Sequence, residues 1–162
     1  MKVDYAVLKE KAIEMLKDRG IELIDIAEIT YELQRKYYDD LTLDDCLENV
    51  LAVLDKREVI NTVMTGIEID RLVEEGCVRE PLRSILLNDY SLYGIDEVLA
   101  YSIVNVYGSI GLTNFGYVDK IKLGIISEID EKGKDPNRCN TFLDDIVGAI
   151  AAAAASRIAH GR

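Results

Sequence analysis

Apolar side chains recur at every third or fourth position along most of the chain, which is the spacing of helices that bury one face. The first apolar stripe ends at Gly20, a typical residue just beyond a helix carboxy terminus. The second stripe begins at Ile24 and ends near Tyr38, before a turn of polar residues. The amino-terminal part of the chain, residues 1–80, is therefore predicted to consist of helices.

The next helix has a recognisable start. Thr42 is followed three residues later by Asp45, the T-x-x-D pattern in which the two side chains cap a helix amino terminus together. We expect this helix to be long, to break at Gly66 and to be followed by a separate helix over 67–75. A further short helix is expected from Pro81, because proline is well placed in a first turn.

The second half of the chain changes in character. From residue 94 onward it is apolar, rich in small residues and tyrosine, and poor in charge. The pattern predicts two helices over 95–107 and 109–122. Residues 128–140 are charged and contain Gly133 and Pro136, so they are predicted to form a surface loop. A last helix is expected over 141–159.

The last helix has small residues on nearly every face, from Gly148 and Ala149 through the alanine run 151–155. Neighbouring helices can approach such a helix closely from all sides. Alanine is also chosen for helix propensity alone, but the interspersed Ile146 and Ile150 favour burial. We therefore predict an all-α, multihelical single domain over residues 1–162, with this small-residue helix at its centre.

Composition restricts the function. Thirty acidic residues face nineteen basic ones, a formal charge of −11, which disfavours nucleic acid as a partner and repels anionic lipid headgroups. At most peripheral membrane contact is expected. Three separated cysteines predict neither a disulfide framework nor a zinc site. No apolar run reaches the roughly 18 residues of a bilayer span, and no secretory signal opens the chain. A cytoplasmic location is expected.

Two familiar kinds of catalytic group are disfavoured. His160 is the single histidine and lies near the end of the chain, where geometry is poorly held, so a serine–histidine hydrolase is not expected. Cys77 and Arg83 have the C-x5-R spacing of cysteine-dependent phosphatases. However, the residues between them contain no glycine, and Pro81 removes a backbone amide that would bind phosphate. We interpret this as a chance match.

Pairs of acidic residues are the stronger candidates. Asp96-Glu97 and Asp144-Asp145 each open an apolar helix, and Asp44-Asp45 occupies the same place after Thr42. Carboxylates in a first turn are stabilised by the helix dipole and by unpaired amides, so capping explains any one pair taken alone. The first two pairs differ because their helices are expected to be buried. A buried carboxylate must be neutralised, paired or bound to a metal ion.

Other polar groups lie between these two pairs. Asp119 adds a third carboxylate, and Asn114 adds an amide inside an apolar stretch. Clustered oxygen ligands suit Mg²⁺ better than zinc or copper. Lys120 or Lys122 would then bind a phosphate as a point charge, although ordinary solvent exposure is expected for one of the two.

Three stretches resemble the carboxy-terminal motifs of the phosphatidylglycerophosphatase A family, in the same order and with similar spacing. They are Tyr93 to Val98, Asn114 to Lys122 and Thr141 to Ile150. The resemblance covers about residues 90–160. Within the family, the chain is similar to a shorter, soluble branch of uncharacterised bacterial proteins. That branch is multihelical, with one helix surrounded by others.

The resemblance implies a Mg²⁺-dependent phosphatase of lipid metabolism that acts on phosphatidylglycerophosphate. It implies that Asp96, Glu97, Asp144 and Asp145 hold the metal ion. Catalytic roles would belong to Asp96, Asp119 and Asp145, and the phosphate would be bound by Lys122 and Asn114.

The chain also departs from the membrane-bound members. It has no transmembrane segment and no amino-terminal Gly-Thr-x-Gly-Ser stretch, and Leu123 replaces a proline. The expected substrate is thus a phosphate monoester that is either a lipid or a water-soluble compound. The alternative is a non-catalytic helical interaction or assembly protein on the same scaffold. A chain this small and apolar is also expected to form a homo-oligomer.

Overall fold

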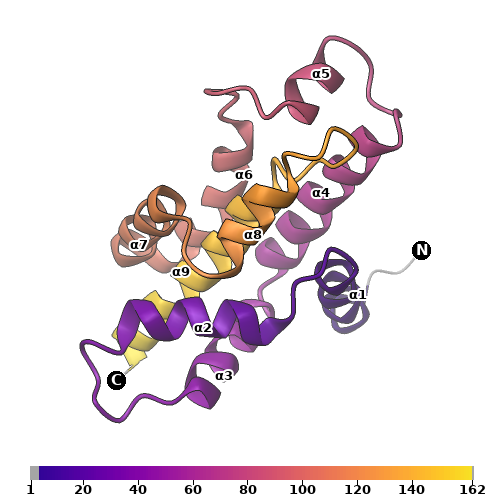
Figure 1. The fold of residues 1–162 in the computed structure, drawn as a ribbon. Helices are drawn as coiled ribbons and strands as arrows, with labels where there is room; N and C mark the ends of the chain where they lie inside the picture. Colours follow the sequence, from indigo (N-terminus) through magenta and orange to yellow (C-terminus); the bar gives the residue numbers. More distant parts are fainter. Residues whose placement is uncertain (1–3, 162) are drawn as a thin grey trace.

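The computed structural model describes residues 4–161, and this part of the chain consists of helices and connecting loops without a strand (Figure 1). The elements are α1 (Tyr5–Asp18), α2 (Leu23–Gln34), α3 (Leu43–Val53), α4 (Arg57–Glu74), α5 (Leu82–Leu87), α6 (Ile95–Val104), the 3₁₀ turn η1 (Asn105–Tyr107), α7 (Gly108–Ile121), α8 (Ile125–Lys132) and α9 (Leu143–Gly161).

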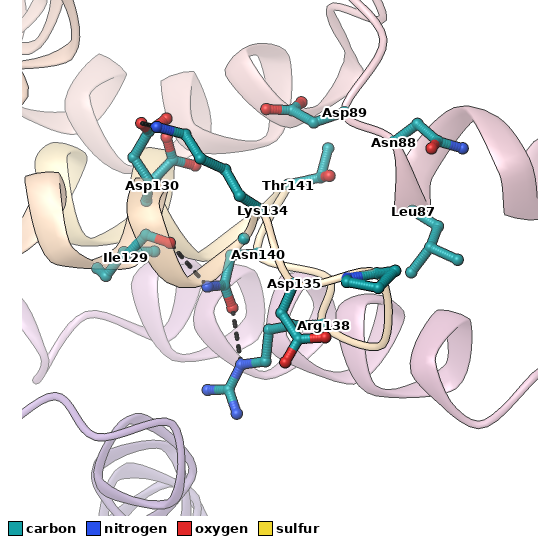
Figure 2. Close-up of a pocket in the computed structure, with 13 residues that line it drawn as sticks. Leu87, Asn88, Asp89, Ile129, Asp130, Lys134, Asp135, Arg138, Asn140 and Thr141 are labelled. Carbon is teal, nitrogen blue, oxygen red and sulfur yellow. Dashed lines mark hydrogen bonds and ion pairs between the residues drawn. The ribbon is translucent and has the colours of Figure 1, made fainter.

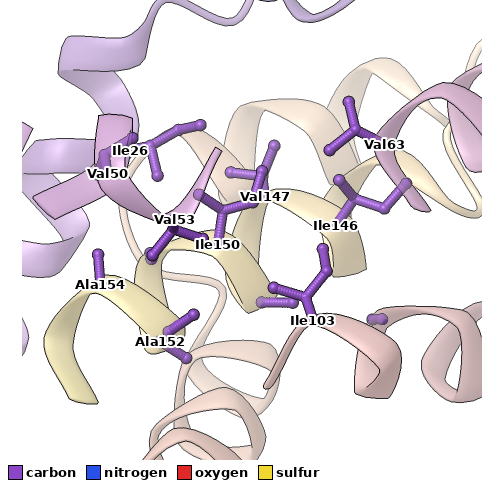
Figure 3. Packing of buried hydrophobic residues seen from close by; sticks show 14 of the residues in the cluster. Ile26, Val50, Val53, Val63, Ile103, Ile146, Val147, Ile150, Ala152 and Ala154 are labelled. Atoms are coloured by element: carbon purple, nitrogen blue, oxygen red, sulfur yellow. The ribbon is translucent and has the colours of Figure 1, made fainter. Parts of the chain in front are cut away.

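Helix α9 lies at the centre of the fold, as predicted. It runs through the middle of the molecule in Figure 1 and packs against α2, α3, α4, α6, α7 and α8. Its larger side chains, Ile146, Val147 and Ile150, meet buried residues from the surrounding helices (Figure 3). The alanines at 151–155 are completely buried. The all-α fold with a central small-residue helix is therefore confirmed.

Gly66 does not break a helix, and this prediction was wrong. Helix α4 continues through it, and the chain is interrupted earlier, between α3 and α4. A Cβ atom at position 66 would lie 2.3 Å from Cδ1 of Ile146 and 3.1 Å from Cβ of Phe142. The glycine therefore lets α4 cross the beginning of α9 at close range, which outweighs its low helix propensity.

The surface loop expected over 128–140 was also wrong in its first part. Helix α8 occupies residues up to Lys132, with Ile126 and Ile129 buried against the core. Only these two residues of the helix are buried, and the charged residues around them face solvent. The segment therefore has the composition of a surface loop. The loop begins only at Gly133, where α8 ends.

The two helices expected in the apolar region are present. Helix α6 with the turn η1 covers 95–107, and α7 covers 108–121. The short helix after Pro81 is α5. Within residues 4–161, no helix combines the length and apolar character that crossing a bilayer requires.

Candidate functional site

Three carboxylates from two helices meet beside the start of α9. Asp119 lies in the last turn of α7, and Asp144 and Asp145 lie in the first turn of α9. One oxygen from each lies within 4.8 Å of the other two. Asp145 is buried, with only 5% of its surface exposed. This separation is small enough for all three groups to contact one cation.

Lys122 joins two of these carboxylates. Its Nζ donates to Oδ1 of Asp119 at 2.7 Å and to Oδ2 of Asp144 at 2.9 Å. The residue ends α7 in the left-handed conformation, with φ of 48°. A residue with a Cβ atom adopts this conformation at a cost of roughly 1–2 kcal/mol. The residue whose strained backbone ends α7 is therefore the same residue whose ammonium group contacts the acidic cluster.

One lysine does not balance this cluster. Burial raises the pKa of Asp145, and the negative charges of Asp144, Asp119 and Asp96 raise it further. Burial also raises the pKa of Asp144, against the opposing effect of Lys122. Burial lowers the pKa of Lys122, but its two carboxylate partners raise it by more. The cluster therefore holds excess negative charge that a proton or a metal cation would neutralise.

Asp96 and Glu97 belong to the same electrostatic environment. Oδ1 of Asp96 is buried and has no hydrogen-bond partner among the residues that the structure describes. Burial raises the pKa of Glu97, and the charges of Asp96 and Asp119 raise it further. The compact group thus consists of two predicted metal ligands, Asp144 and Asp145, and of Asp119, which was predicted to be catalytic. The other two predicted ligands, Asp96 and Glu97, lie near it.

Asp89 is an additional acid that the sequence did not indicate. It lies in the loop after α5 and has a positive φ of 45°. Burial raises its pKa, and the charge of Asp96 is the next largest cause, followed by smaller effects of Asp130 and Asp119. Its sequence context, Asn88-Asp89, is that of an ordinary turn, so no local pattern identifies it.

Asn114 is not joined to the cluster by a hydrogen bond. Its Nδ2 atom is buried and has no partner in the described part of the chain. Lys120, the other lysine considered for phosphate, is exposed. Lys122 is therefore the cation whose contacts place it at the carboxylates.

The first turn of α9 is held by a residue that sequence reasoning missed. The completely buried carboxylate of Asp70, on α4, accepts the backbone N–H of Phe142 at 3.2 Å and that of Leu143 at 3.1 Å. Burial raises its pKa to about 7, against the lowering effect of these amide donors. Asp70 and Gly66 are four residues apart, so the same face of α4 contacts the beginning of α9 at two points.

The segment before α9 is held from several sides. Arg19 forms paired hydrogen bonds with Glu74 at 2.9 and 2.8 Å and also donates to the Asn140 side chain at 2.8 Å. Nδ2 of Asn140 donates to the carbonyl of Ile129, and the Thr141 hydroxyl donates to the carbonyl of Leu86. Contacts from α1, α4, α5 and α8 therefore fix the residues that lead into the acidic pair.

A pocket of about 420 Å³ opens beside Asp144. It is lined by Leu87, Asn88, Asp89, Ile129, Asp130, Gly133, Lys134, Asp135, Pro136, Arg138, Asn140, Thr141 and Asp144. Figure 2 shows the Lys134 side chain extending to Asp130 and Arg138 bonded to Asn140. Because both basic groups are engaged, the pocket offers mainly hydrogen-bond acceptors to a ligand.

The donor set fits a hard divalent cation. Every side chain in the compact group supplies carboxylate oxygen, and Asp96 adds a buried oxygen without a partner. Mg²⁺ is typically held by one or two carboxylates together with substrate oxygens and water. The arrangement can thus hold such an ion between the acidic group and a phosphate ester.

Comparison with known proteins identifies the family of the chain that carries this site. The family model for phosphatidylglycerophosphatase A matches residues 24–160. The chain belongs to the phosphatidylglycerophosphatase A family. Membership suggests a metal-dependent, phosphatase-like activity and a phosphate-ester substrate. The match includes Asp70 on α4 as well as the three acidic motifs.

The family relatives are similar along nearly their whole length. "Uncharacterized protein YutG" of Bacillus subtilis is 55% identical over 156 residues, which cover 96% of this chain and 93% of the relative. The crystal structure of the low temperature requirement C protein from Listeria monocytogenes is 56% identical, with a TM-score of 0.91 and coverage of 95% and 96%. A protein of unknown function from Bacillus stearothermophilus is also 56% identical, with a TM-score of 0.90 and coverage of 94% of each chain.

Proposed function

We propose that this chain is a Mg²⁺-dependent phosphatase that hydrolyses a phosphate monoester beside the first turn of α9. The observation that carries the proposal is the group of Asp119, Asp144 and Asp145, in which one oxygen of each residue lies within 4.8 Å of the other two and a single lysine contacts two of the three. A protein gains nothing in stability from three crowded carboxylates unless a cation joins them. Family membership supplies the chemical class.

Each residue has a proposed role. Asp119, Asp144 and Asp145 hold the metal ion, with Asp96 and Glu97 at its edge. Bound Mg²⁺ would supply positive charge to the phosphoryl oxygens as the P–O bond breaks. Lys122 orients the phosphate by exchanging part of its contact with Asp119 or Asp144 for a phosphoryl oxygen. Asp96 accepts a proton from the attacking water at its unpartnered Oδ1.

The pocket beside Asp144 receives the alcohol part of the ester. Its volume of about 420 Å³ suits a small group rather than extended hydrocarbon chains. Its lining includes the carboxylate of Asp89 and the hydroxyl of Thr141. These groups accept hydrogen bonds, so they favour an alcohol with free hydroxyls, such as a polyol phosphate or the exposed head of a phosphoglycerol lipid.

The test is phosphate release from the full chain with Mg²⁺ and with EDTA. The substrates are glycerol 3-phosphate and phosphatidylglycerophosphate in mixed micelles, which separate a soluble ester from a lipid. We expect turnover only with Mg²⁺. Asp145→Asn should lower it by about 10³-fold or more, because the variant removes a ligand charge at the reacting group.

Asp45→Asn is the matched control, because Asp45 occupies the equivalent first-turn position in α3. This variant should retain wild-type turnover, and both variants should retain wild-type helicity by circular dichroism. Full activity in Asp145→Asn, or equal binding of Mg²⁺ by wild type and Asp145→Asn in calorimetry, would contradict the proposed site.

A further inference from the structure

Helices α6 and α7 carry a surface that differs from the rest of the molecule. Residues 98–118 contain no charged side chain, although 30% of the chain is charged. Both helices nevertheless lie at the outside of the fold, where they flank α9 (Figure 1). An uncharged stretch of this length is expected in a buried helix, and here it is partly exposed.

The exposed residues are large and apolar. The α6–α7 face is defined here by Ile95, Val98, Tyr101, Val106, Ile110 and Tyr117, each more than a third exposed. The rings of Tyr101 and Phe115 make an edge-on contact with centroids 5.5 Å apart, which joins the two helices. Adjoining exposed apolar residues typically mark interaction sites.

Gly116 gives a second, independent indication. It lies inside α7, and a Cβ atom placed there would meet nothing within 4 Å. Glycine in a helix interior costs about 1 kcal/mol relative to alanine, and the chain's own packing does not require it. Ser109 and Thr113 are exposed on the same side of α7. Small residues at this spacing permit close approach of a helix from another molecule.

The charge of the chain indicates what covers this face. Two copies with a formal charge of −11 repel each other wherever their acidic surfaces meet. The α6–α7 face is an extended uncharged surface on which two copies can meet with little repulsion. We propose that this face joins two copies of the chain in a symmetric dimer, with α7 of one copy packed near Gly116 of the other.

A lipid surface fits the same face less well. Helices that lie on membranes usually carry lysine and arginine beside the apolar residues, and aromatic anchors that include tryptophan. The chain has no tryptophan, and Asp96, Glu97 and Asp119 lie at the ends of the face. These carboxylates would be repelled by anionic headgroups.

The proposed dimer leaves the pocket accessible. The pocket is lined by the end of α5, the α5–α6 loop, α8, the segment before α9 and Asp144 in the first turn of α9, and none of these residues belongs to the α6–α7 face. The dimer therefore does not depend on the proposed catalytic activity, and measurement of mass tests it without an activity assay.

Sedimentation of the full chain tests the proposal with a matched pair of variants. Val98 and Val7 have similar exposure, 60% and 58%, and both lie in helices. Val98→Lys should give the monomer of 18.2 kDa, and Val7→Lys should remain a dimer of twice that mass, like wild type. Each lysine lowers the net negative charge, so general repulsion would not explain dissociation.

Ile110→Lys, on α7, provides a second disruption in case Val98→Lys fails to fold by circular dichroism. It should also be a monomer. Wild type that is monomeric at roughly 100 μM chain, or both lysine variants remaining dimeric, would overturn the proposal. Co-sedimentation of wild type, but not Val98→Lys, with anionic phosphatidylglycerol vesicles would overturn it in favour of a membrane surface.

Gly116→Ala separates the two effects of the glycine. Alanine should raise the melting temperature of the monomeric Ile110→Lys protein, because it favours the helix and meets no neighbour. In the otherwise wild-type chain it should weaken the dimer by about tenfold. A dimer that is unchanged or tighter would contradict a close approach at Gly116.

Discussion

Helices α3 and α9 both begin with two aspartates, and the two pairs have different environments. Asp45 completes a capping box, in which its carboxylate accepts the Thr42 amide at 2.9 Å and the Thr42 hydroxyl at 2.7 Å. Asp145 is buried and lies beside Asp144 and Asp119. The same dipeptide is thus a local cap in one helix and part of a charged cluster in the other. Burial and the nearby carboxylates make the difference.

The two helices also obtain their caps differently. The amide of Asp45 is capped by the side chain of Thr42, three residues away. The first amides of α9 are capped by Asp70, which is more than seventy residues away and lies on α4. As a result, Asp144 and Asp145 are not needed as caps and remain available for other partners. The contrast leads to four predictions about stability.

The largest effect is expected from Asp70→Ala. The buried amides of Phe142 and Leu143 would lose their acceptor, which should lower the free energy of unfolding by about 3 kcal/mol. Urea denaturation in EDTA measures it, with Asp70→Asn as the control that keeps size and one acceptor oxygen. A loss no larger than that caused by Thr42→Ala would show that the remote cap is unimportant.

A smaller effect is expected from pH in the metal-free protein. Asp70 and Asp145 both have a higher pKa in the folded protein than the ordinary value of 3.8. Their contribution to the free energy of unfolding is therefore complete below pH 3.8 and is lost as the pH rises through their folded-state pKa values. The free energy of unfolding in EDTA should therefore fall by about 2 kcal/mol between pH 5 and pH 8. Addition of Mg²⁺ at pH 8 should restore the part that Asp145 contributes, because an ion held at the proposed site would stabilise the native state. A flat profile would contradict the pKa directions.

Replacement of Asp145 and replacement of Asp45 by asparagine should change the stability of the protein in opposite directions. At pH 8 in EDTA, Asp145→Asn removes a buried carboxyl group whose raised pKa weakens the folded state, and it should stabilise the protein by about 1–2 kcal/mol. Asp45→Asn weakens a capping box and should destabilise it. Thermal unfolding of the two variants gives the comparison. Destabilisation by both would mean that Asp145 is a structural residue.

The smallest effect is expected from Thr42→Ala. Loss of this cap should lower the free energy of unfolding by about 1 kcal/mol. Phosphatase turnover should remain unchanged, because α3 contributes no side chain to the acidic cluster or to the pocket beside Asp144. Reduced turnover at temperatures where the variant is fully folded would indicate that the two first turns are coupled.

Periodicity was sufficient to predict most helices and the central position of α9. It was misleading at Gly66, because the sequence does not distinguish a glycine that permits a close helix crossing from a glycine that ends a helix. It was also misleading at α8, where a short buried contact of Ile126 and Ile129 lies among charged residues. In both places the deciding contact comes from a distant helix.

The site was predictable only in part. The resemblance to the family identified the three acidic motifs, and the structure brings Asp119, Asp144 and Asp145 together. Asp70 could not be identified, because it lies inside a continuous helix and its partners are remote in sequence. Asp89 is likewise indistinguishable from a turn residue until its neighbours are placed. The functional roles of all these side chains remain predictions.

The alanine run in α9 has a consequence for how the protein can change. Residues 151–155 are the simplest part of the sequence, yet each methyl group is enclosed by neighbouring helices. Any larger side chain there would have to displace a surrounding helix, and overpacking of this kind lowers the stability of the folded protein. In a library of random substitutions, the most repetitive segment should therefore be among the least variable, whereas the chemically diverse outer helices should accept many replacements.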